Sequence, residues 1–296
     1  MGSTPRPHRF AIPMATRSTD VATLEQCPGK WMLTQFMETQ QAEATYFELG
    51  SALHETIEAT ILDDLDLDTA LYTMDIRLDA WIEGLEDSGK RVIETTDKTV
   101  DTVKDMADRM MRQWFIDVHP DSDKRLPIYD DYQWPPQVEH EFRRDVGLKY
   151  PIWGSVDAIF QHQNLDAGLA IVDWKSGKGR AKDFQLHFYE FGLALDVPAV
   201  GWFHQLDRKR KSAKIQMMED DWPGTNEMLG DIAVAESTKQ DLLDGWVEWN
   251  QDWWCNYCTV QEFCPVEGQD TEANDKAYIR MLSYAKPMTQ PYEKKE

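Results

Sequence analysis

Two aspartates and a lysine near the middle of the chain have the residue types and spacing that metal-dependent phosphodiester hydrolysis requires. Asp173 and Lys175 form an Asp-x-Lys triplet around Trp174, sixteen residues after Asp157. Carboxylates bind Mg²⁺ or Mn²⁺ together with substrate phosphates, and the metal makes hydroxide available near neutral pH. A lysine beside them would orient that hydroxide or stabilise charge developing on phosphorus. The alternative is a water-exposed ion pair at a strand end, because Asp-x-Lys alone is common.

Two predicted strands would position these residues. Residues 150–160 alternate and are rich in β-branched and aromatic side chains, and residues 168–174 form a short apolar run of strand length. The polar link between them is short enough for an antiparallel hairpin. Side chains alternate along a strand, so the second aspartate and the lysine should share one face while the tryptophan packs on the other. The first aspartate can then meet them.

Length and composition indicate a globular protein. The 296 residues are 42% hydrophobic and include 12 tryptophans, which is ample for a core. No apolar stretch approaches the length that spans a bilayer, and residues 1–18 contain no signal-peptide core. We therefore expect a cytoplasmic protein without a membrane partner, in which disulfides are not expected.

The charge is strongly acidic but unevenly distributed. The formal net charge is −22, which argues against a broad basic surface for DNA. Residues 175–214 carry nine lysines or arginines and four acids, a net charge of +5 that leaves −27 for the rest. Such a local basic track suits one DNA strand better than a wide duplex face, although an ordinary solvated hairpin is the alternative. The candidate DNA contacts are Lys178, Arg180, Lys182, Arg208, Lys209, Arg210 and Lys211.

The four cysteines could form one complete tetrahedral site. Cys255, Cys258 and Cys264 lie within ten residues, and Cys27 comes from the far end of the chain. Zinc and iron-sulfur clusters both accept four cysteines, so the spacing does not separate them. Closing a loop of about 228 residues would remove unfolded-state freedom on the order of 5 kcal/mol, so the site would act as a clasp. Buried inert cysteines are the alternative.

The order of motifs resembles the RecB-type branch of the PD-(D/E)xK nucleases. More narrowly, it is similar to the CRISPR-associated and phage-encoded exonucleases of the fourth Cas family and to the AddB nuclease domain, which share the split four-cysteine cluster. The resemblance covers about residues 20–265. The motifs in order are Cys27, Gly50-Ser-Ala-Leu-His54, Gly154-Ser-Val-Asp157, Asp173-Trp-Lys175, Gln185-x3-Tyr189 and Cys255-x2-Cys258-x5-Cys264.

The resemblance implies roles for further residues. His54, on a predicted helix 49–62, would be a ligand of the catalytic metal together with Asp157 and Asp173; a lone helical histidine is otherwise more often packed or solvated. Gln185 and Tyr189 share a face of a predicted helix, and would position the phosphate or the attacking water. The alternative is an amide–phenol pair on the surface. The cysteines would hold a 4Fe-4S cluster.

Other segments are predicted from periodicity. Glu139 and Glu141 lie in a probable strand, residues 137–146, whose alternation puts both on one face; we leave them outside the metal set. Residues 99–118 form a helix whose methionine and tryptophan stripe is core or a cap over the site. Residues 238–254 carry a stripe of tryptophans that predicts a helix leading to Cys255.

The expected fold is α/β (α+β): a PD-(D/E)xK core with a small mixed sheet flanked by helices. We expect a flexible tail (1–18), a nuclease domain (19–265) with a helical insertion (about 63–130), an iron-sulfur module (19–48 with 237–265) and a polar tail (266–296). The expected function is Mg²⁺- or Mn²⁺-dependent exonucleolytic cleavage of single-stranded DNA, 5′-to-3′ by resemblance, in recombination, repair or CRISPR-type processing.

Two other functions remain open at this stage. The chain could be a non-catalytic subunit that binds DNA ends in a recombination or CRISPR complex, with protein partners. The intact Asp, Asp, Lys and Gln-x3-Tyr set weighs against it, because binding alone does not need all of these groups. A zinc-stapled protein-binding module would explain the cysteines but not the rest.

Overall fold

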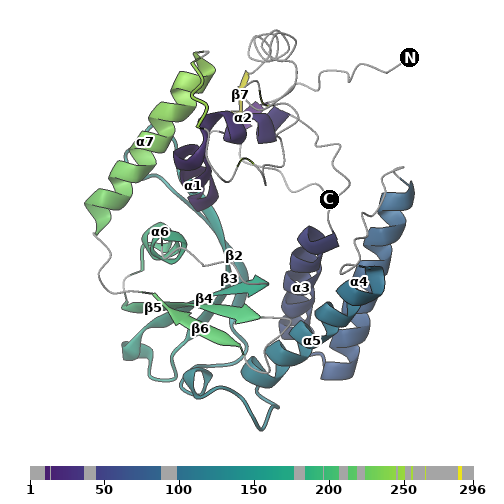
Figure 1. The fold of residues 1–296 in the computed structure, drawn as a ribbon. Coiled ribbons are helices and arrows are strands. Elements are labelled where there is room, and N and C mark those ends of the chain that lie inside the picture. Colours follow the sequence, from purple (N-terminus) through teal and green to yellow (C-terminus); the bar gives the residue numbers. More distant parts are fainter. Residues whose placement is uncertain are drawn as a thin grey trace. The chain divides into compact units, whose positions relative to one another are not determined.

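The computed structural model describes residues 11–13, 15–36, 45–87, 99–176, 184–195, 197–206, 213–218, 224–244, 246–250, 255, 264 and 286–288. The chain divides into two compact units. Unit 1 contains residues 1–40, 143–154 and 223–296, and unit 2 contains residues 41–142 and 155–222. Figure 1 labels the elements of both units.

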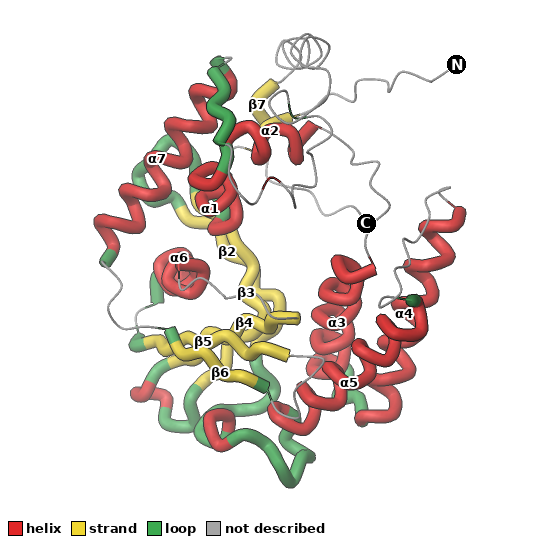
Figure 2. The backbone as a smooth tube through the Cα atoms, viewed as in Figure 1, coloured by secondary structure: helices red, strands yellow, loops and turns green. Residues whose placement is uncertain are grey.

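A five-stranded mixed sheet, most of it in unit 2, carries Asp157, Asp173 and Lys175 (Figure 2). Its strand order is β2-β3-β4-β5-β6. The β3–β4 and β5–β6 pairs are antiparallel, and β4–β5 is parallel, with α6 (Phe184–Leu193) in the crossover. The predicted mixed α/β fold is confirmed. The strands are β2 (Gln137–Arg144), β3 (Ile152–Gln161), β4 (Leu169–Ser176), β5 (Ala199–Leu206) and β6 (Lys214–Met217).

The β3–β4 hairpin has the antiparallel pairing expected from the sequence, with Ala158 opposite Val172. Its connection contains a short 3-10 helix capped by the side chain of Asn164. Gly168 follows with a φ of 96°, and a Cβ at this position would lie 1.9 Å from the carbonyl oxygen of Pro198. Glycine alone tolerates both the left-handed φ and this close approach. The local sequence therefore sets the hairpin and the register of its two strands.

Three helices form the helical layer of unit 2: α3 (Thr45–Leu62), α4 (Leu67–Asp87) and α5 (Val100–Val118). Helix α3 packs against α4, α5 and β4. Helix α5 begins after Thr99, whose side chain accepts the backbone N–H of Thr102 as an N-cap. Its methionine and tryptophan stripe is core rather than a cap over the site, because all four side chains are at most 3% exposed: Val103, Met106, Met110 and Trp114.

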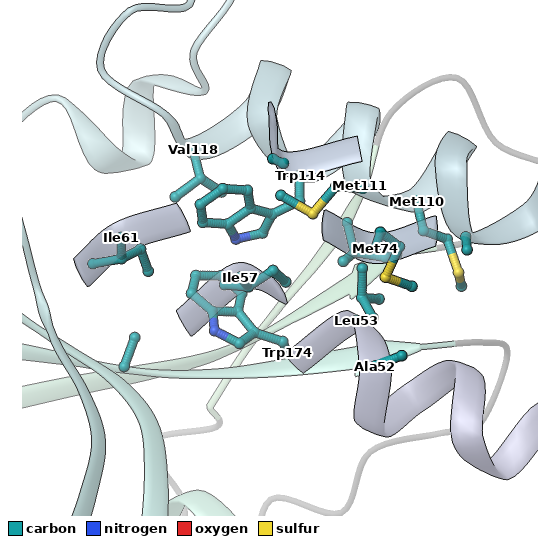
Figure 3. Packing of buried hydrophobic residues seen from close by; sticks show 14 of the residues in the cluster. Ala52, Leu53, Ile57, Ile61, Met74, Met110, Met111, Trp114, Val118 and Trp174 are labelled. Atoms are coloured by element: carbon teal, nitrogen blue, oxygen red, sulfur yellow. The ribbon is translucent and has the colours of Figure 1, made fainter. Parts of the chain in front are cut away.

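Trp174 of β4 joins this core (Figure 3). Its ring meets that of Trp114 edge to face, with centroids 6.0 Å apart, and Ile57 of α3 lies beside it in Figure 3. The prediction that this tryptophan packs away from Asp173 and Lys175 is confirmed by its place in the core beside the helical layer, whereas Asp173 and Lys175 contact each other. Burial of so large a ring holds the middle of β4 against the helical layer.

Unit 1 joins segments from both ends of the chain. Helix α7 packs against α1 and α2, and β1 pairs with β7 in a parallel two-stranded sheet. The predicted polar tail thus contributes a short strand. The elements of this unit are β1 (Ala11–Pro13), α1 (Ser18–Gln26), α2 (Pro28–Phe36), α7 (Thr225–Leu243) and β7 (Lys286–Met288).

A buried lysine connects these segments. Lys239 of α7 is 1% exposed, and its ammonium donates to Asp20 Oδ2 at 3.0 Å, to the Ala15 carbonyl at 3.0 Å and to the Thr16 hydroxyl at 3.4 Å. The Trp31 indole donates to the other carboxylate oxygen of Asp20 at 2.8 Å. We call these five residues the lysine staple. Thr16 is fully buried, so residues 15–18 are not the flexible tail that the sequence suggested.

The helix predicted over residues 238–254 ends much earlier. Helix α7 ends at Leu243 with Asp244 as C-cap, and the backbone N–H of Trp246 donates to the carbonyl of Asp241 at 2.8 Å. This six-to-one bond is typical of a Schellman ending, and the sequence places Gly245 where that ending favours glycine. Trp246 is 76% exposed. The tryptophan periodicity therefore wrongly predicted that the helix continues to residue 254. Gly245 was the better signal of where the helix ends.

Candidate active site

The β3–β4 register brings the two aspartates together. Continuing the pairing of Ala158 with Val172 by one position puts Asp157 opposite Asp173, and paired residues of antiparallel strands share a face. The backbone N–H of Trp174 donates to Asp157 Oδ2 at 2.7 Å, which orients that carboxylate. The predicted meeting of the two aspartates on neighbouring strands is thus what the structure contains.

Helix α3 brings His54 to this pair. The helix buries a stripe of apolar side chains, among them Leu53 and Ile57, and His54 lies at its edge with Nδ1 3.6 Å from Asp157 Oδ2. Gly50, one turn earlier, allows the approach of the helix to the end of β4, because a Cβ there would lie 3.1 Å from the Ser176 hydroxyl. The predicted metal-ligand histidine therefore faces the aspartates.

Glu139 of β2 completes a set of donors that the sequence did not predict. Single ligand atoms of His54, Glu139 and Asp157 all lie within 4.8 Å of one another. The Ser155 hydroxyl holds the Glu139 carboxylate at 3.0 Å. Glu139 has a φ of 46°, which breaks the regular extended conformation, and Glu141 is exposed instead of sharing its surroundings. The available signal was a glutamate in the strand before Gly154-Ser-Val-Asp157.

Asp173 is the most buried member of the site. It is 1% exposed, and its Oδ2 lies 2.5 Å from the Lys175 ammonium without an aligned hydrogen bond to any described group. Burial and the charge of Asp157 raise the pKa of Asp173 to about 7, although Lys175 lowers it. The ion pair that was the alternative to a metal site does exist, but it is buried within the acidic cluster rather than solvated.

The pKa values report an excess of negative charge. Burial lowers the pKa of His54, whereas Asp157, Asp173 and Glu139 raise it, with a net value of about 9. Burial and Asp157 also raise the pKa of Glu139. Three carboxylates and an imidazole converge here, with Lys175 as the nearby ammonium. This donor set fits Mg²⁺ or Mn²⁺, and the imidazole is more natural for Mn²⁺.

A hydrogen-bonded chain extends from Lys175 to α6. The Lys175 ammonium donates to Gln185 Oε1 at 2.9 Å, and Gln185 Nε2 donates to the Tyr189 hydroxyl at 2.6 Å. Burial and the carboxylates of Asp173 and Asp157 raise the pKa of Tyr189 well above its usual range. Tyr189 therefore keeps its proton. Because the hydroxyl accepts the hydrogen bond from Gln185, its own proton is still available for donation to another group. Gln185 and Tyr189 therefore face the site and are not the amide–phenol pair on the surface that was the alternative.

The cysteines are only partly described. Cys27, Cys255 and Cys264 are free thiols, and Cys258 lies outside the described residues. The three described thiols are not gathered within 4.8 Å of one another as a metal-ligating group. Two of their segments do meet in unit 1: the Asn250 side chain donates to the Gln26 carbonyl at 3.2 Å, and the Asn250 carbonyl accepts the Cys255 thiol at 3.8 Å.

The predicted DNA contacts lie outside the described residues, so their placement stays a prediction. They are Lys178, Arg180, Lys182, Arg208, Lys209, Arg210 and Lys211. In the described part of the chain, no helix has both the length and the apolar character needed to cross a membrane.

Comparisons with known proteins agree with this geometry. Residues 18–265 match the protein family described as the PD-(D/E)XK nuclease superfamily, a span that includes every residue of the candidate active site. The structure of a putative exonuclease from Eubacterium rectale aligns over 84% of this chain and 87% of that chain, with 11% identity and a TM-score of 0.50. That likeness concerns the fold alone.

Another solved structure, SSO0001, aligns over 89% of both chains with 13% identity. Its TM-score of 0.37 is too low to support an argument. No curated protein sequence matches the chain.

Proposed function

Because the chain belongs to the PD-(D/E)XK nuclease superfamily, whose nucleases use divalent metals, we propose that it is a Mg²⁺- or Mn²⁺-dependent deoxyribonuclease that degrades single-stranded DNA from its ends. The observation that carries the proposal is the meeting of His54, Glu139 and Asp157 within 4.8 Å, beside Asp173 and Lys175. A binding protein has no need for three converging carboxylates, since they repel phosphate unless a cation neutralises them.

The proposed roles follow from donor type and position. His54, Asp157 and Asp173 would hold the metal, with Glu139 as an additional carboxylate ligand and the Trp174 carbonyl as a further donor. Bound metal would supply an activated water near neutral pH and clamp the phosphate oxygens. Asp173 would bind the metal only after losing the proton that its raised pKa favours, so metal and proton compete at this carboxylate.

Lys175, Gln185 and Tyr189 would act on the phosphate and the water. The Lys175 ammonium is partly exposed, which leaves it able to orient hydroxide or to stabilise charge on phosphorus. Gln185 holds Lys175 on one side and Tyr189 on the other, so it would keep both at a constant separation. The Tyr189 hydroxyl would donate a hydrogen bond to a phosphate oxygen or to the attacking water and keep its proton.

The 5′-to-3′ polarity rests on the family resemblance, and the preference for single-stranded ends rests on the resemblance and on charge. A basic window of net +5 in a chain of −22 suits one strand entering a narrow site. The name of the Eubacterium rectale protein agrees with exonuclease activity. Recombination, repair and CRISPR-type processing would all use the same site.

Within the superfamily we further propose the RecB-type branch, similar to the fourth Cas family and AddB, with a 4Fe-4S cluster on Cys27, Cys255, Cys258 and Cys264. The resemblance carries this part. The structure contributes only the contact, through Asn250, between the segments of Cys27 and Cys255.

Cleavage of DNA with and without ends tests the activity. Protein purified without air is incubated with 5′-labelled linear single strands, 3′-labelled single strands, circular single strands or duplex, plus Mn²⁺ or Mg²⁺. We expect linear single strands to be shortened, with mononucleotides or short oligonucleotides released first from the 5′ label, and circles to persist. Lys175→Met should abolish cutting, while Asp166→Asn, an exposed aspartate in the β3–β4 turn, should cut normally. Binding without cutting by wild type would favour the non-catalytic alternative.

The same preparation tests the cluster. A brown protein containing about four irons and four sulfides per chain supports the cluster, whereas a colourless protein containing zinc contradicts it. Cys27→Ala should lower the free energy of unfolding by about 2–5 kcal/mol, the range observed when a native cross-link is removed. Mn²⁺ affinity at Asp173 should change little. Near-normal thermal stability in that variant would contradict the clasp.

A further inference from the structure

A buried hydrogen-bonded network lies on the face of the sheet opposite the candidate active site. It consists of Tyr129 of the 3-10 helix Pro127–Tyr129 and of Trp202 and His204 of β5, with Asp117 of α5 nearby. The Tyr129 hydroxyl lies 2.7 Å from His204 Nδ1 and accepts the Trp202 indole N–H at 3.2 Å. His204 Nε2 lies 3.8 Å from Asp117 Oδ2. Tyr129, Trp202 and His204 are all 0% exposed.

The donors and acceptors assign one arrangement of protons. The Trp202 indole can only donate, so it fills an acceptor position of the Tyr129 hydroxyl. If the hydroxyl proton is donated to His204 Nδ1, the imidazole proton lies on Nε2, which makes no hydrogen bond among the described groups and has the Asp117 carboxylate 3.8 Å away. Burial lowers the pKa of His204 to about 3, so the ring is neutral, as this arrangement requires. This tautomer turns the Nε2 proton toward the Asp117 carboxylate, whereas the other would turn a lone pair toward it, so we assign the first.

The network is in direct contact with Trp174. His204 is the register partner of Trp174 on the parallel neighbour strand, and the two rings lie with centroids 5.6 Å apart. Phe160, which packs on Tyr129 with centroids 5.4 Å apart, contacts Trp174 from β3 at 6.5 Å. Trp114 of α5 also contacts the Trp174 indole edge to face, so rings from α5, β3 and β5 surround it.

Trp174 in turn connects to three groups of the active site. Asp173 and Lys175 are its neighbours in the chain, and its backbone N–H orients the Asp157 carboxylate at 2.7 Å. A shift of the indole would move this backbone segment and misplace all three groups together. Misplacement by about 1 Å can lower a reaction rate about a hundredfold.

We propose that Tyr129 and His204 are positioning residues of the active site: their hydrogen bond fixes the Trp174 indole, and Trp174 fixes Asp157, Asp173 and Lys175. This inference rests on the proposed function, because it assigns the two residues to the same metal site. Neither residue touches the metal or the DNA; both act from the opposite face of the sheet.

Tyr129→Phe tests the network, with Tyr132→Phe as the matched control. Tyr129→Phe removes the hydroxyl and keeps the ring that packs on Phe160 and Trp202. Tyr132 also packs on Phe160 and Trp202, but its hydroxyl does not belong to the network. Single-turnover cleavage and Mn²⁺ titration are measured for both. We expect Tyr129→Phe to lower the cleavage rate and the Mn²⁺ affinity each by about tenfold, with KM for DNA unchanged, and Tyr132→Phe to match wild type.

A second pair of variants addresses His204 if Tyr129→Phe does not fold. His204→Asn keeps an acceptor close to the position of Nδ1, whereas His204→Leu has none. We expect His204→Asn to retain more Mn²⁺ affinity and cleavage than His204→Leu. Equal values for the two, or a Tyr129→Phe protein that melts earlier but binds Mn²⁺ and cuts like wild type, would overturn the inference.

The experiment separates this inference from the proposed function. Wild type that binds Mn²⁺ but cuts no DNA contradicts the proposed function, and the Mn²⁺ affinities of the variants then decide the inference. Wild type that cuts DNA beside an unimpaired Tyr129→Phe contradicts the inference alone.

Discussion

At the scale of residues, the site is defined by an excess of negative charge that the ammonium of Lys175 does not neutralise. Three carboxylates and His54 converge, and burial prevents water from solvating Asp173. Proton uptake is the response of such a cluster to the absence of a cation, which is why the pKa values of Asp173 and His54 rise to about 7 and about 9.

These pKa values predict how the stability of the metal-free protein depends on pH. Both groups hold a proton more tightly in the folded state than in the unfolded state, so stability falls as pH rises. Asp173 contributes this fall from its ordinary value near 3.8 up to about 7, and His54 from 6.5 up to about 9. We expect the melting temperature in chelator to be lower at pH 9 than at pH 6.

Two controls accompany this measurement. Saturating Mg²⁺ should reduce the fall, because the ion replaces the protons. His54→Gln should remove the part between pH 6.5 and 9. Identical melting curves against pH for wild type and His54→Gln would contradict the assigned electrostatics.

Glu139 provides a second prediction at this scale. Glu139→Gln keeps the shape of the side chain and removes its charge, so Mn²⁺ affinity should fall about tenfold. Glu141→Gln is the matched control on the same strand and should bind Mn²⁺ like wild type. Isothermal titration measures both. Equal affinities for the two variants would remove Glu139 from the ligand set.

Period-two alternation along the strands predicted that Asp157 and Asp173 meet, because it is a strong local signal, whereas His54 was assigned to the site by the family resemblance. Glu139 was missed for a local reason. Alternation put Glu139 and Glu141 on one face and assigned a role to neither, and nothing in the side-chain pattern announces the left-handed φ of Glu139 that interrupts this alternation.

At the scale of elements, the hairpin and helices α3, α5 and α6 were predictable, because each has a clear period and local boundaries such as Thr99 and Gly168. The end of α7 was not, because the tryptophan spacing continued past Gly245. The lysine staple was also beyond prediction: Asp20 and Lys239 are separated by most of the chain, and no local pattern pairs them.

The lysine staple predicts that one conservative substitution, Asp20→Asn, greatly lowers the free energy of unfolding. Asp20→Asn leaves the buried ammonium of Lys239 without its counter-charge, which should cost about 3 kcal/mol of unfolding free energy. Asp241→Asn, exposed on the same helix as Lys239, should cost little. Urea denaturation monitored by tryptophan fluorescence measures both. Comparable midpoints for the two variants would show that the staple contributes little to stability.

At the scale of the whole molecule, a chain of net charge −22 has to bind a polyanion. We assign the binding of DNA to metal at the site and to the basic window of residues 175–214. Binding should therefore depend on the divalent ion and should weaken only modestly with salt, because the salt dependence scales with the number of phosphates contacted and this window contacts few.

The central claim is that Asp173 belongs to the centre that cleaves DNA. Its most direct test is the single-turnover rate of cleavage of linear single-stranded DNA by wild type and Asp173→Asn at saturating Mn²⁺. We predict a rate at least about a thousandfold lower in the variant, the scale of losing a group that stabilises the reacting charge. A variant that cuts DNA within about tenfold of wild type would contradict the account.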